Sequence, residues 1–137
     1  MESMSNPEPP VSILLVEDEN VTLELLTIIL TKKYPDVALH TAGNGRTGLE
    51  LFKTHTPQIV VTDINMPEMG GVQMAEKIHA IKADTKFIVI TGNSAKSALE
   101  ASVGTRFVID HYIVKPVSFE ALFEAIEECL GKIAQQN

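Results

Sequence analysis

The sequence predicts an α/β fold, a doubly wound parallel sheet of five strands with helices on both faces. Short apolar runs, which are typical of buried strands, alternate along the chain with segments whose apolar residues recur at the helical period. This alternation indicates a parallel sheet with right-handed crossovers. The length of 137 residues suits a single domain.

The first half of the chain contains three predicted strands and two helices, separated by proline, glycine and acidic residues. Tyr34 ends the first helix, because the residue before a proline is disfavoured in the α region. The predicted elements are a strand at Val11–Val16, a helix from an N-cap at Asn20 to Tyr34, a strand at Val37–Ala42, a helix between the turn Gly43–Gly45 and Pro57, and a strand at Ile59–Thr62.

The second half continues the alternation with two strands and three helices. Ser118 is placed to cap the last helix, and Glu120 in its first turn matches the helix dipole. The predicted elements are a helix at Gly71–Ile81, a strand at Phe87–Ile90, a helix at Ala95–Val103, a strand that ends at Ile113 and Val114, and a helix with its apolar face at Phe119, Leu122, Phe123, Ile126 and Leu130.

The charge and the cysteine content of the chain argue against nucleic-acid binding and exclude an intrachain disulfide. The formal charge of −7 argues against nucleic-acid binding, because phosphate contacts need a basic patch, and it is compatible with a cation at an acidic site. The single cysteine, Cys129, cannot form an intrachain disulfide and is expected to be a small buried apolar residue.

We expect one domain at residues 11–133, a disordered N-terminal tail at 1–10 and a short C-terminal tail at 134–137. The first ten residues include two acidic ones and lack the apolar segment of a signal peptide. No stretch reaches the length of a membrane-spanning helix. The expected compartment is therefore the cytoplasm, without membrane association.

Polar and charged residues stand where four of the predicted strands end: Glu17 and Asp18, Asp63, Thr91, and Lys115. The carboxyl ends of parallel strands lie along one edge of a sheet, where open α/β folds bind ligands. Each residue alone has an ordinary explanation, as a cap, a turn residue or a surface lysine. Together, four matched strand ends favour a functional site.

Three carboxylates in one cleft repel one another and raise one another's pKa values, and a divalent cation relieves this repulsion. Mg²⁺ suits a site with one or two carboxylates, waters and phosphate oxygens, and the Asn65 backbone carbonyl is placed to add a ligand. Asp63 could then act as a nucleophile, because carboxylates form acyl phosphates. Lys115 and Thr91 would supply a positive charge and a donor around the phosphoryl oxygens.

Four motifs carry a family resemblance: Val16-Glu17-Asp18-Glu19-Asn20, the segment Asp63–Gly71, Ile90-Thr91-Gly92, and Tyr112-Ile113-Val114-Lys115-Pro116. Through them the chain resembles the receiver domain of bacterial two-component response regulators, over about residues 11–133. Each motif alone is weak, and their combination is specific. The resemblance implies a flavodoxin-like sheet with the strand order 2-1-3-4-5.

The resemblance also implies the chemistry of the site. Asp63 would accept a phosphoryl group from a phosphohistidine on a sensor histidine kinase or phosphotransfer protein. Glu17 and Asp18 would hold Mg²⁺ together with Asp63 and the backbone carbonyl of Asn65, and Lys115 would pair with the phosphate.

A switch is implied in the same way. Thr91 would move to the phosphoryl group and Tyr112 would turn inward in step, which would remodel the face made by the fourth helix, fifth strand and fifth helix. The peptide bond before Pro116 is expected to be cis. Asn65 and Asn93 would flank the path of the hydrolytic water, so replacing either should change the autodephosphorylation rate.

The chain departs from the family pattern before the fifth strand. Val108 and Ile109 stand where receivers usually carry a small Gly-Ala pair, and the interval from Thr91 to Lys115 is slightly longer than is typical. Gly104 is expected to cap the fourth helix early, which would leave the following residues, through Ile109, irregular or extended. This departure concerns the output face and not the pocket.

We expect a signalling domain that catalyses only its own phosphotransfer and autodephosphorylation. It would bind an unknown downstream protein, as a monomer or a phosphorylation-dependent dimer, either alone or as part of a hybrid kinase or larger regulator. One alternative is a phosphatase with an aspartyl-phosphate intermediate, although Asn65 stands where that chemistry needs a general acid and the nucleophile would be expected on the first strand. Another is a receiver that binds partners without phosphorylation.

Overall fold

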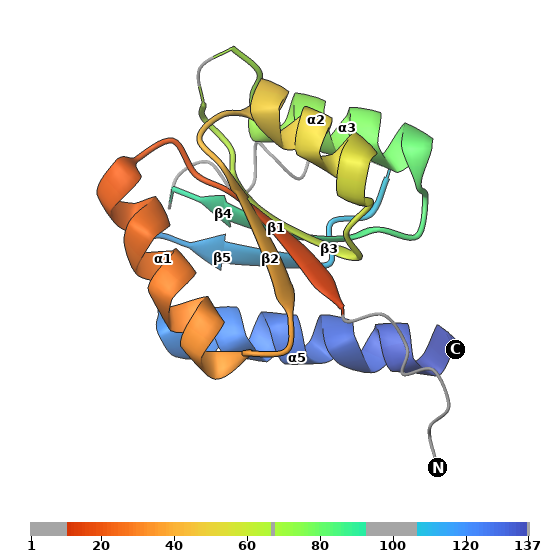
Figure 1. The fold of residues 1–137 in the computed structure, drawn as a ribbon. Helices are drawn as coiled ribbons and strands as arrows, with labels where there is room; N and C mark the ends of the chain where they lie inside the picture. Colours follow the sequence, from red (N-terminus) through yellow and green to blue (C-terminus); the bar gives the residue numbers. More distant parts are fainter. Residues whose placement is uncertain (1–10, 67, 93–106, 137) are drawn as a thin grey trace.

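The computed structural model describes residues 11–66, 68–92 and 107–136, and its strands form one five-stranded parallel sheet (Figure 1). The strands lie in the order β2-β1-β3-β4-β5, which confirms the predicted fold class and strand order. Their bounds are β1 (Ser12–Val16), β2 (Ala38–Ala42), β3 (Ile59–Asp63), β4 (Lys86–Thr91) and β5 (His111–Val114).

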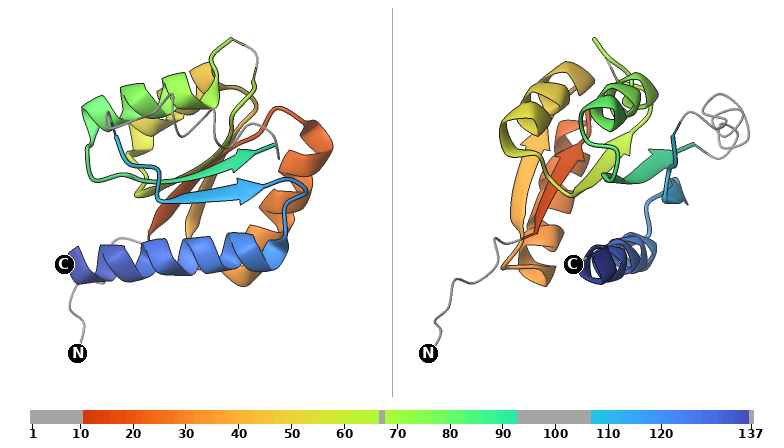
Figure 2. Two further views of the ribbon diagram at one scale, coloured as in Figure 1. Left: turned by 180° about the vertical axis from the view of Figure 1, so that it is seen from behind. Right: turned by 90° about the vertical axis from the view of Figure 1, so that its right-hand side faces the viewer.

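Helices cover both faces of this sheet (Figure 2). The helices of one face are α1 (Asn20–Lys33) and α5 (Phe119–Gln136), and those of the other are α2 (Gly45–His55) and α3 (Gly71–Ile81). Each face has its own apolar core, because successive strand residues point to opposite sides. The central strands are buried on both sides, which explains why they appear in the sequence as continuous apolar runs.

The predicted bounds of the helices are confirmed for α3 and wrong at the start of α1. α1 begins at Asn20, and the capping residue is Glu19, whose backbone is extended and whose side chain makes no capping bond. The Glu17 carboxylate accepts the Glu19 N–H at 3.1 Å, which fixes this turn one residue earlier than predicted. By contrast, Asn44 caps α2 by accepting the Thr47 N–H at 2.8 Å.

The C-terminal helix α5 closes the face that it shares with α1. The Ser118 hydroxyl accepts the Ala121 N–H at 3.2 Å, as expected of a cap. Cys129 is fully buried, as predicted. The helix continues through Gln136, so three of the four residues assigned to a C-terminal tail are helical. The predicted helix at 95–103 and the N-terminal tail lie outside the described residues.

Among the described helices, none combines the length and the apolar character needed to cross a lipid bilayer.

His40 on the edge strand β2 stacks on His55 at the end of α2, with ring centroids 3.9 Å apart and an interplanar angle of 14°. Burial first, and then the charge of His55, lower the pKa of His40 from its usual 6.5. The folded state therefore binds fewer protons than the unfolded state. The stability from neutral His40 is present above about pH 6.5 and is lost as the pH falls through the folded pKa.

We predict that lowering the pH from about 7 to 5 destabilises the native protein more than the His40→Gln variant. Chemical denaturation at a series of pH values measures this difference. In the His55→Gln variant, an NMR titration of His40 should give a higher midpoint, because a neighbouring positive charge is gone. Equal pH slopes for the native protein and His40→Gln would contradict the prediction.

Candidate functional site

Three carboxylates meet at the carboxyl edge of the sheet. Glu17 follows β1 and Asp63 ends β3, and both are buried, while Asp18 is exposed. One carboxylate oxygen from each lies within 4.8 Å of the other two. They open into a cleft of about 630 Å³, which Asn65 and Lys115 also line. The structure therefore brings these five predicted site residues together, and Pro116 lines the same cleft.

Asp63 is held from two sides. Its Oδ2 accepts a hydrogen bond from the Lys115 Nζ at 2.9 Å, and its Oδ1 accepts the Ile64 N–H at 2.8 Å. The hydrogen bond to Asp63 is the main cause that raises the pKa of Lys115 above its usual value, so the ammonium stays charged at neutral pH. The Lys115 N–H donates to the Thr91 carbonyl at 2.8 Å, which ties the lysine to the end of β4.

Among the three carboxyl groups, Glu17 is the one whose ionised form is destabilised by its surroundings. Burial is the largest cause that raises the pKa of its carboxyl group, and the charge of Asp63 adds to it, while the hydrogen bond from the Glu19 N–H opposes it. A buried carboxylate beside other carboxylates is costly unless a cation compensates it. The donors are all oxygens, which is the chemistry that Mg²⁺ prefers, so these residues fit such an ion.

We predict that Glu17→Gln raises Tm in the presence of a chelator, by roughly 2 to 5 °C, because it removes one buried charge from a crowded group. The same variant should lose most of the stabilisation that Mg²⁺ gives to the native protein. Thermal denaturation with and without Mg²⁺ tests both effects. Glu24→Gln, which alters an exposed carboxylate on α1, is the matched control and should behave like the native protein.

Thr91 is buried at the end of β4 and does not line the cleft. Asp63 is in register with Ile90, so these two residues share a face of the sheet and Thr91 points to the other face. The Thr91 hydroxyl donates to the Gly92 carbonyl at 3.3 Å. Direct contact with a group on Asp63 would therefore require Thr91 to move. Asn93, the other predicted residue after β4, lies outside the described residues.

The end of the loop after β3 packs closely against the backbone of Asp63. The Gly71 N–H donates to the Ile64 carbonyl at 2.7 Å, which closes the loop. A Cβ on Gly71 would overlap the Asp63 carbonyl oxygen, so only glycine fits at the start of α3. From the sequence, Gly71 was predicted as the start of a helix and as the end of the motif Asp63–Gly71, without a contact to the backbone of Asp63. Its place as the first residue of a helix, at the end of the loop that follows Asp63, is the signal that points to close packing.

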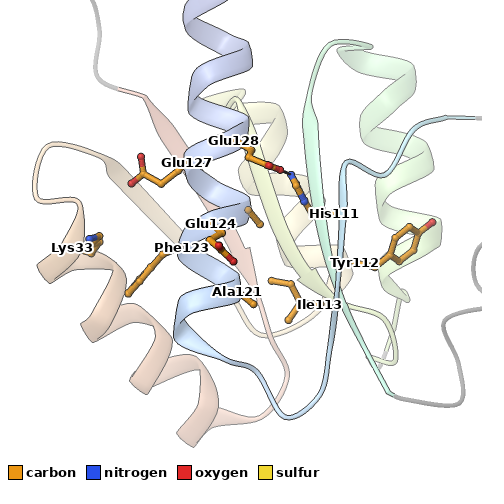
Figure 3. Close-up of a pocket in the computed structure, with 10 residues that line it drawn as sticks. Lys33, His111, Tyr112, Ile113, Ala121, Phe123, Glu124, Glu127 and Glu128 are labelled. Atoms are coloured by element: carbon orange, nitrogen blue, oxygen red, sulfur yellow. Dashed lines mark ion pairs between the residues drawn. The ribbon is translucent and has the colours of Figure 1, made fainter.

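β5 presents different residues to the two sides of the sheet (Figure 3). His111 points towards α5, where its Nε2 lies 2.8 Å from Glu128 Oε1, beside a pocket of about 700 Å³. Tyr112 points away from α5 and packs against the core on the opposite face. Lys115 follows this strand, and its peptide bond to Pro116 is cis, as the resemblance implies.

The segment before β5, residues 107–110, is held against the core and against β4. Phe107 is buried and packs edge-on against Phe87, with centroids 5.6 Å apart. Residues 107–110 form neither helix nor strand, in agreement with the irregular segment expected before residue 110. Asp110 fixes the segment to β4, because its carboxylate accepts the Phe87 N–H at 2.8 Å and its own N–H donates to the Phe87 carbonyl at 2.9 Å.

Comparison with known proteins agrees with this arrangement. The family described as response regulator receiver domain matches residues 13–127. The transcriptional regulatory protein YesN of Bacillus subtilis is 29% identical over 127 residues, which are 91% of this chain and 34% of YesN. A chemotaxis protein CheY homolog of Campylobacter jejuni is 29% identical over 121 residues, which are 87% of this chain and 92% of that protein.

Among solved structures, the response regulator protein TrrA of Thermotoga maritima, in complex with Mg²⁺-BeF, is 31% identical with a TM-score of 0.74. The alignment covers 87% of this chain and 98% of TrrA. The chain thus spans about a third of YesN and nearly the whole of TrrA and the CheY homolog.

Proposed function

The chain belongs to the response regulator receiver domain family, and from this premise we propose that Asp63 accepts a phosphoryl group from a phosphohistidine on a sensor histidine kinase or phosphotransfer protein. One observation carries the proposal. A buried aspartate is paired with a lysine at 2.9 Å and lies beside two further carboxylates at the edge of the sheet where ligands bind.

In the proposed reaction, an Asp63 carboxylate oxygen attacks the phosphorus atom as the P–N bond of the phosphohistidine breaks. The products are an acyl phosphate on Asp63 and a histidine, which takes up a proton from solvent. Ile64 and Lys115 orient the nucleophile through its two oxygens. The Lys115 ammonium lies where it would neutralise charge on the phosphoryl oxygens.

Glu17, Asp18 and Asp63 are proposed to hold Mg²⁺, with the backbone carbonyl of Asn65 as a further ligand. When bound, the ion would neutralise charge on the carboxylates and the phosphoryl oxygens. The oxygen donor set supports this assignment, as does the presence of Mg²⁺-BeF in the related TrrA structure. Hydrolysis of the acyl phosphate would return the site to its starting state, with Asn65 and Asn93 near the path of the water.

The proposed response is a shift between two packings of the face formed by the fourth helix, β5 and α5, of which the fourth helix lies outside the described residues. Thr91 would move to the phosphoryl group and Tyr112 would follow it, which alters the surface offered to a downstream protein. Such a module would work in the cytoplasm, as a monomer or a phosphorylation-dependent dimer. It would serve as a stand-alone regulator or as part of a larger one.

The exposed apolar residues of α1 are candidates for contact with the phosphoryl donor. Val21, Leu25 and Ile28 recur at helical spacing on the outward side of this helix, and Leu25 lines the cleft. Phe119 at the start of α5 is exposed on the same cleft. Apolar residues that rim a reactive site are typical of protein contact surfaces.

We predict that Ile28→Ser lowers the rate of phosphoryl transfer from an autophosphorylated sensor kinase about tenfold at limiting kinase. The rate of labelling by acetyl phosphate should not change, because Ile28 does not line the cleft. Ile81→Ser is the matched control, since Ile81 on α3 is 48% exposed against 50% for Ile28. If the two variants changed the rate of phosphoryl transfer from the kinase equally, the outward side of α1 would be excluded as the contact surface for the phosphoryl donor.

The test of the proposed function is phosphorylation of the native protein by acetyl phosphate with Mg²⁺. Mass spectrometry should detect one phosphoryl group per chain that hydroxylamine removes, and EDTA should prevent its formation. If the protein forms no such adduct, the proposal fails. Rapid turnover of many phosphomonoesters would instead support the phosphatase alternative. Binding of partners with no adduct would support a receiver that acts without phosphorylation.

A further inference from the structure

The first turn of α2 lies against the loop that follows Asp63. Gly45, the first residue of α2, has no room for a side chain: a Cβ there would overlap the Met69 carbonyl oxygen and lie 2.9 Å from the Met69 carbonyl carbon. The obstacle is backbone, which cannot rotate away. Any side chain at position 45 must therefore displace the helix or the loop.

The same turn makes a second contact with this loop. Arg46, next to Gly45, places its Nη1 3.8 Å from Glu68 Oε1. Glu68 has a φ of 69°, in the left-handed region that residues other than glycine rarely adopt. A residue in this conformation persists only where its surroundings hold it. The loop is thus a strained segment that α2 supports from outside.

A displacement at Met69 has a short path to the acidic site. Two residues later, Gly71 donates to the Ile64 carbonyl at 2.7 Å and packs on the backbone of Asp63. Ile64 in turn donates to the Asp63 carboxylate, and the next residue, Asn65, lines the cleft. Movement of the loop would therefore change the positions of a proposed metal ligand and of the nucleophile.

We propose that Gly45 is a positioning residue: the first turn of α2 holds the loop after β3 in the form that binds the divalent cation. This inference rests on the proposed function for the identity of the ion, and it assigns the support of the site to a helix that contributes no residue lining the cleft. Residues behind metal ligands commonly change metal affinity by about 10- to 100-fold when they are replaced.

The test compares three alanine variants on or beside the same helix. Gly45→Ala crowds the loop backbone. Gly48→Ala crowds the Met74 Sδ at 2.8 Å and a Val16 methyl group at 3.0 Å, and Gly43→Ala meets nothing within 4 Å. If Gly45 has only a structural role, Gly45→Ala and Gly48→Ala should lower Mg²⁺ affinity to a similar extent. A positioning role predicts that only Gly45→Ala changes cation binding.

Mg²⁺ affinity is measured by NMR titration, and the metal-free proteins are compared by amide hydrogen exchange. For Gly45→Ala we expect Mg²⁺ affinity to fall by about tenfold or more. We also expect faster exchange of the Gly71 amide without metal, while amides of β1 and β3 keep their protection. The variants at 43 and 48 should keep the native Mg²⁺ affinity. Native values for Gly45→Ala, or an equal loss in Gly48→Ala, would overturn the proposal.

Arg46→Ala keeps the proposal testable if Gly45→Ala does not fold. Arg46 is exposed, and its weak ion pair with Glu68 cannot decide folding. The variant should bind Mg²⁺ about two- to threefold more weakly, and its Gly71 amide should exchange faster than in the native protein. Native Mg²⁺ affinity and native exchange in this variant would contradict the proposal that α2 supports the loop. Mg²⁺ affinity and amide hydrogen exchange are both measured without phosphorylation, so their outcome does not depend on the proposed function. A native protein that takes no phosphoryl group would refute that function alone.

Discussion

Asp63→Asn is expected to reduce phosphorylation by acetyl phosphate to background. An amide oxygen is a poor nucleophile and cannot form the acyl phosphate, although the side chain keeps its size and the oxygen that accepts the Ile64 N–H. The variant should remain folded, because it removes one of three crowded carboxylates. Mass spectrometry after incubation with Mg²⁺ and acetyl phosphate measures the result.

Asp110→Asn is the matched control for this variant. The Asp110 side chain is 9% exposed against 7% for Asp63, and it likewise accepts a backbone N–H and pairs with a lysine, Lys132, at 3.3 Å. It lies at the other end of β5, away from the cleft. A native level of adduct is expected there. An adduct that survives in Asp63→Asn would show that another residue is the acceptor.

Lys115→Ala should slow the labelling of Asp63 by roughly 10²- to 10³-fold at saturating Mg²⁺, the usual cost of removing one preorganised group that stabilises transition-state charge. The variant removes the ammonium group that lies 2.9 Å from Asp63 Oδ2. The rate of adduct formation, followed by mass at several times, gives the effect.

Lys132→Ala controls for the loss of a lysine that pairs with an aspartate. Its side chain is 49% exposed, against 46% for Lys115, and its partner is Asp110 rather than Asp63. The rate of labelling should match that of the native protein. Comparable losses in both lysine variants would mean that overall charge, and not the position of Lys115, determines the rate.

The sequence was sufficient to predict the meeting of Glu17, Asp18, Asp63 and Lys115. Each stands at the end of an apolar run, and the ends of parallel strands share an edge. The orientation of Thr91 could not be predicted, because it depends on the register of β3 against β4. A shift of one residue in register exchanges the two faces of a strand.

Apolar positions on α1 carried a signal that the sequence interpretation did not use. Four apolar residues follow the helical period and pack in or against the core: Leu23, Leu26, Ile29 and Leu30. The remaining apolar residues, Val21, Leu25 and Ile28, lie on the other side and are exposed. The sequence therefore already showed a surplus of apolar residues on the outward side of this amphipathic helix.

The contact of Gly45 with Met69 could not be predicted from the sequence, because no periodic pattern relates the start of a helix to a distant loop.

The burial of Cys129 makes this protein suitable for site-directed labelling. Burial raises the pKa of its thiol to about 11, and maleimide and similar reagents react with exposed thiolates. Because Cys129 is the only cysteine in the sequence, a cysteine placed at Val108, which is 71% exposed, would be the single reactive thiol. A fluorophore there would lie in the segment that leads into β5, the strand of Tyr112, in a chain that has no tryptophan of its own.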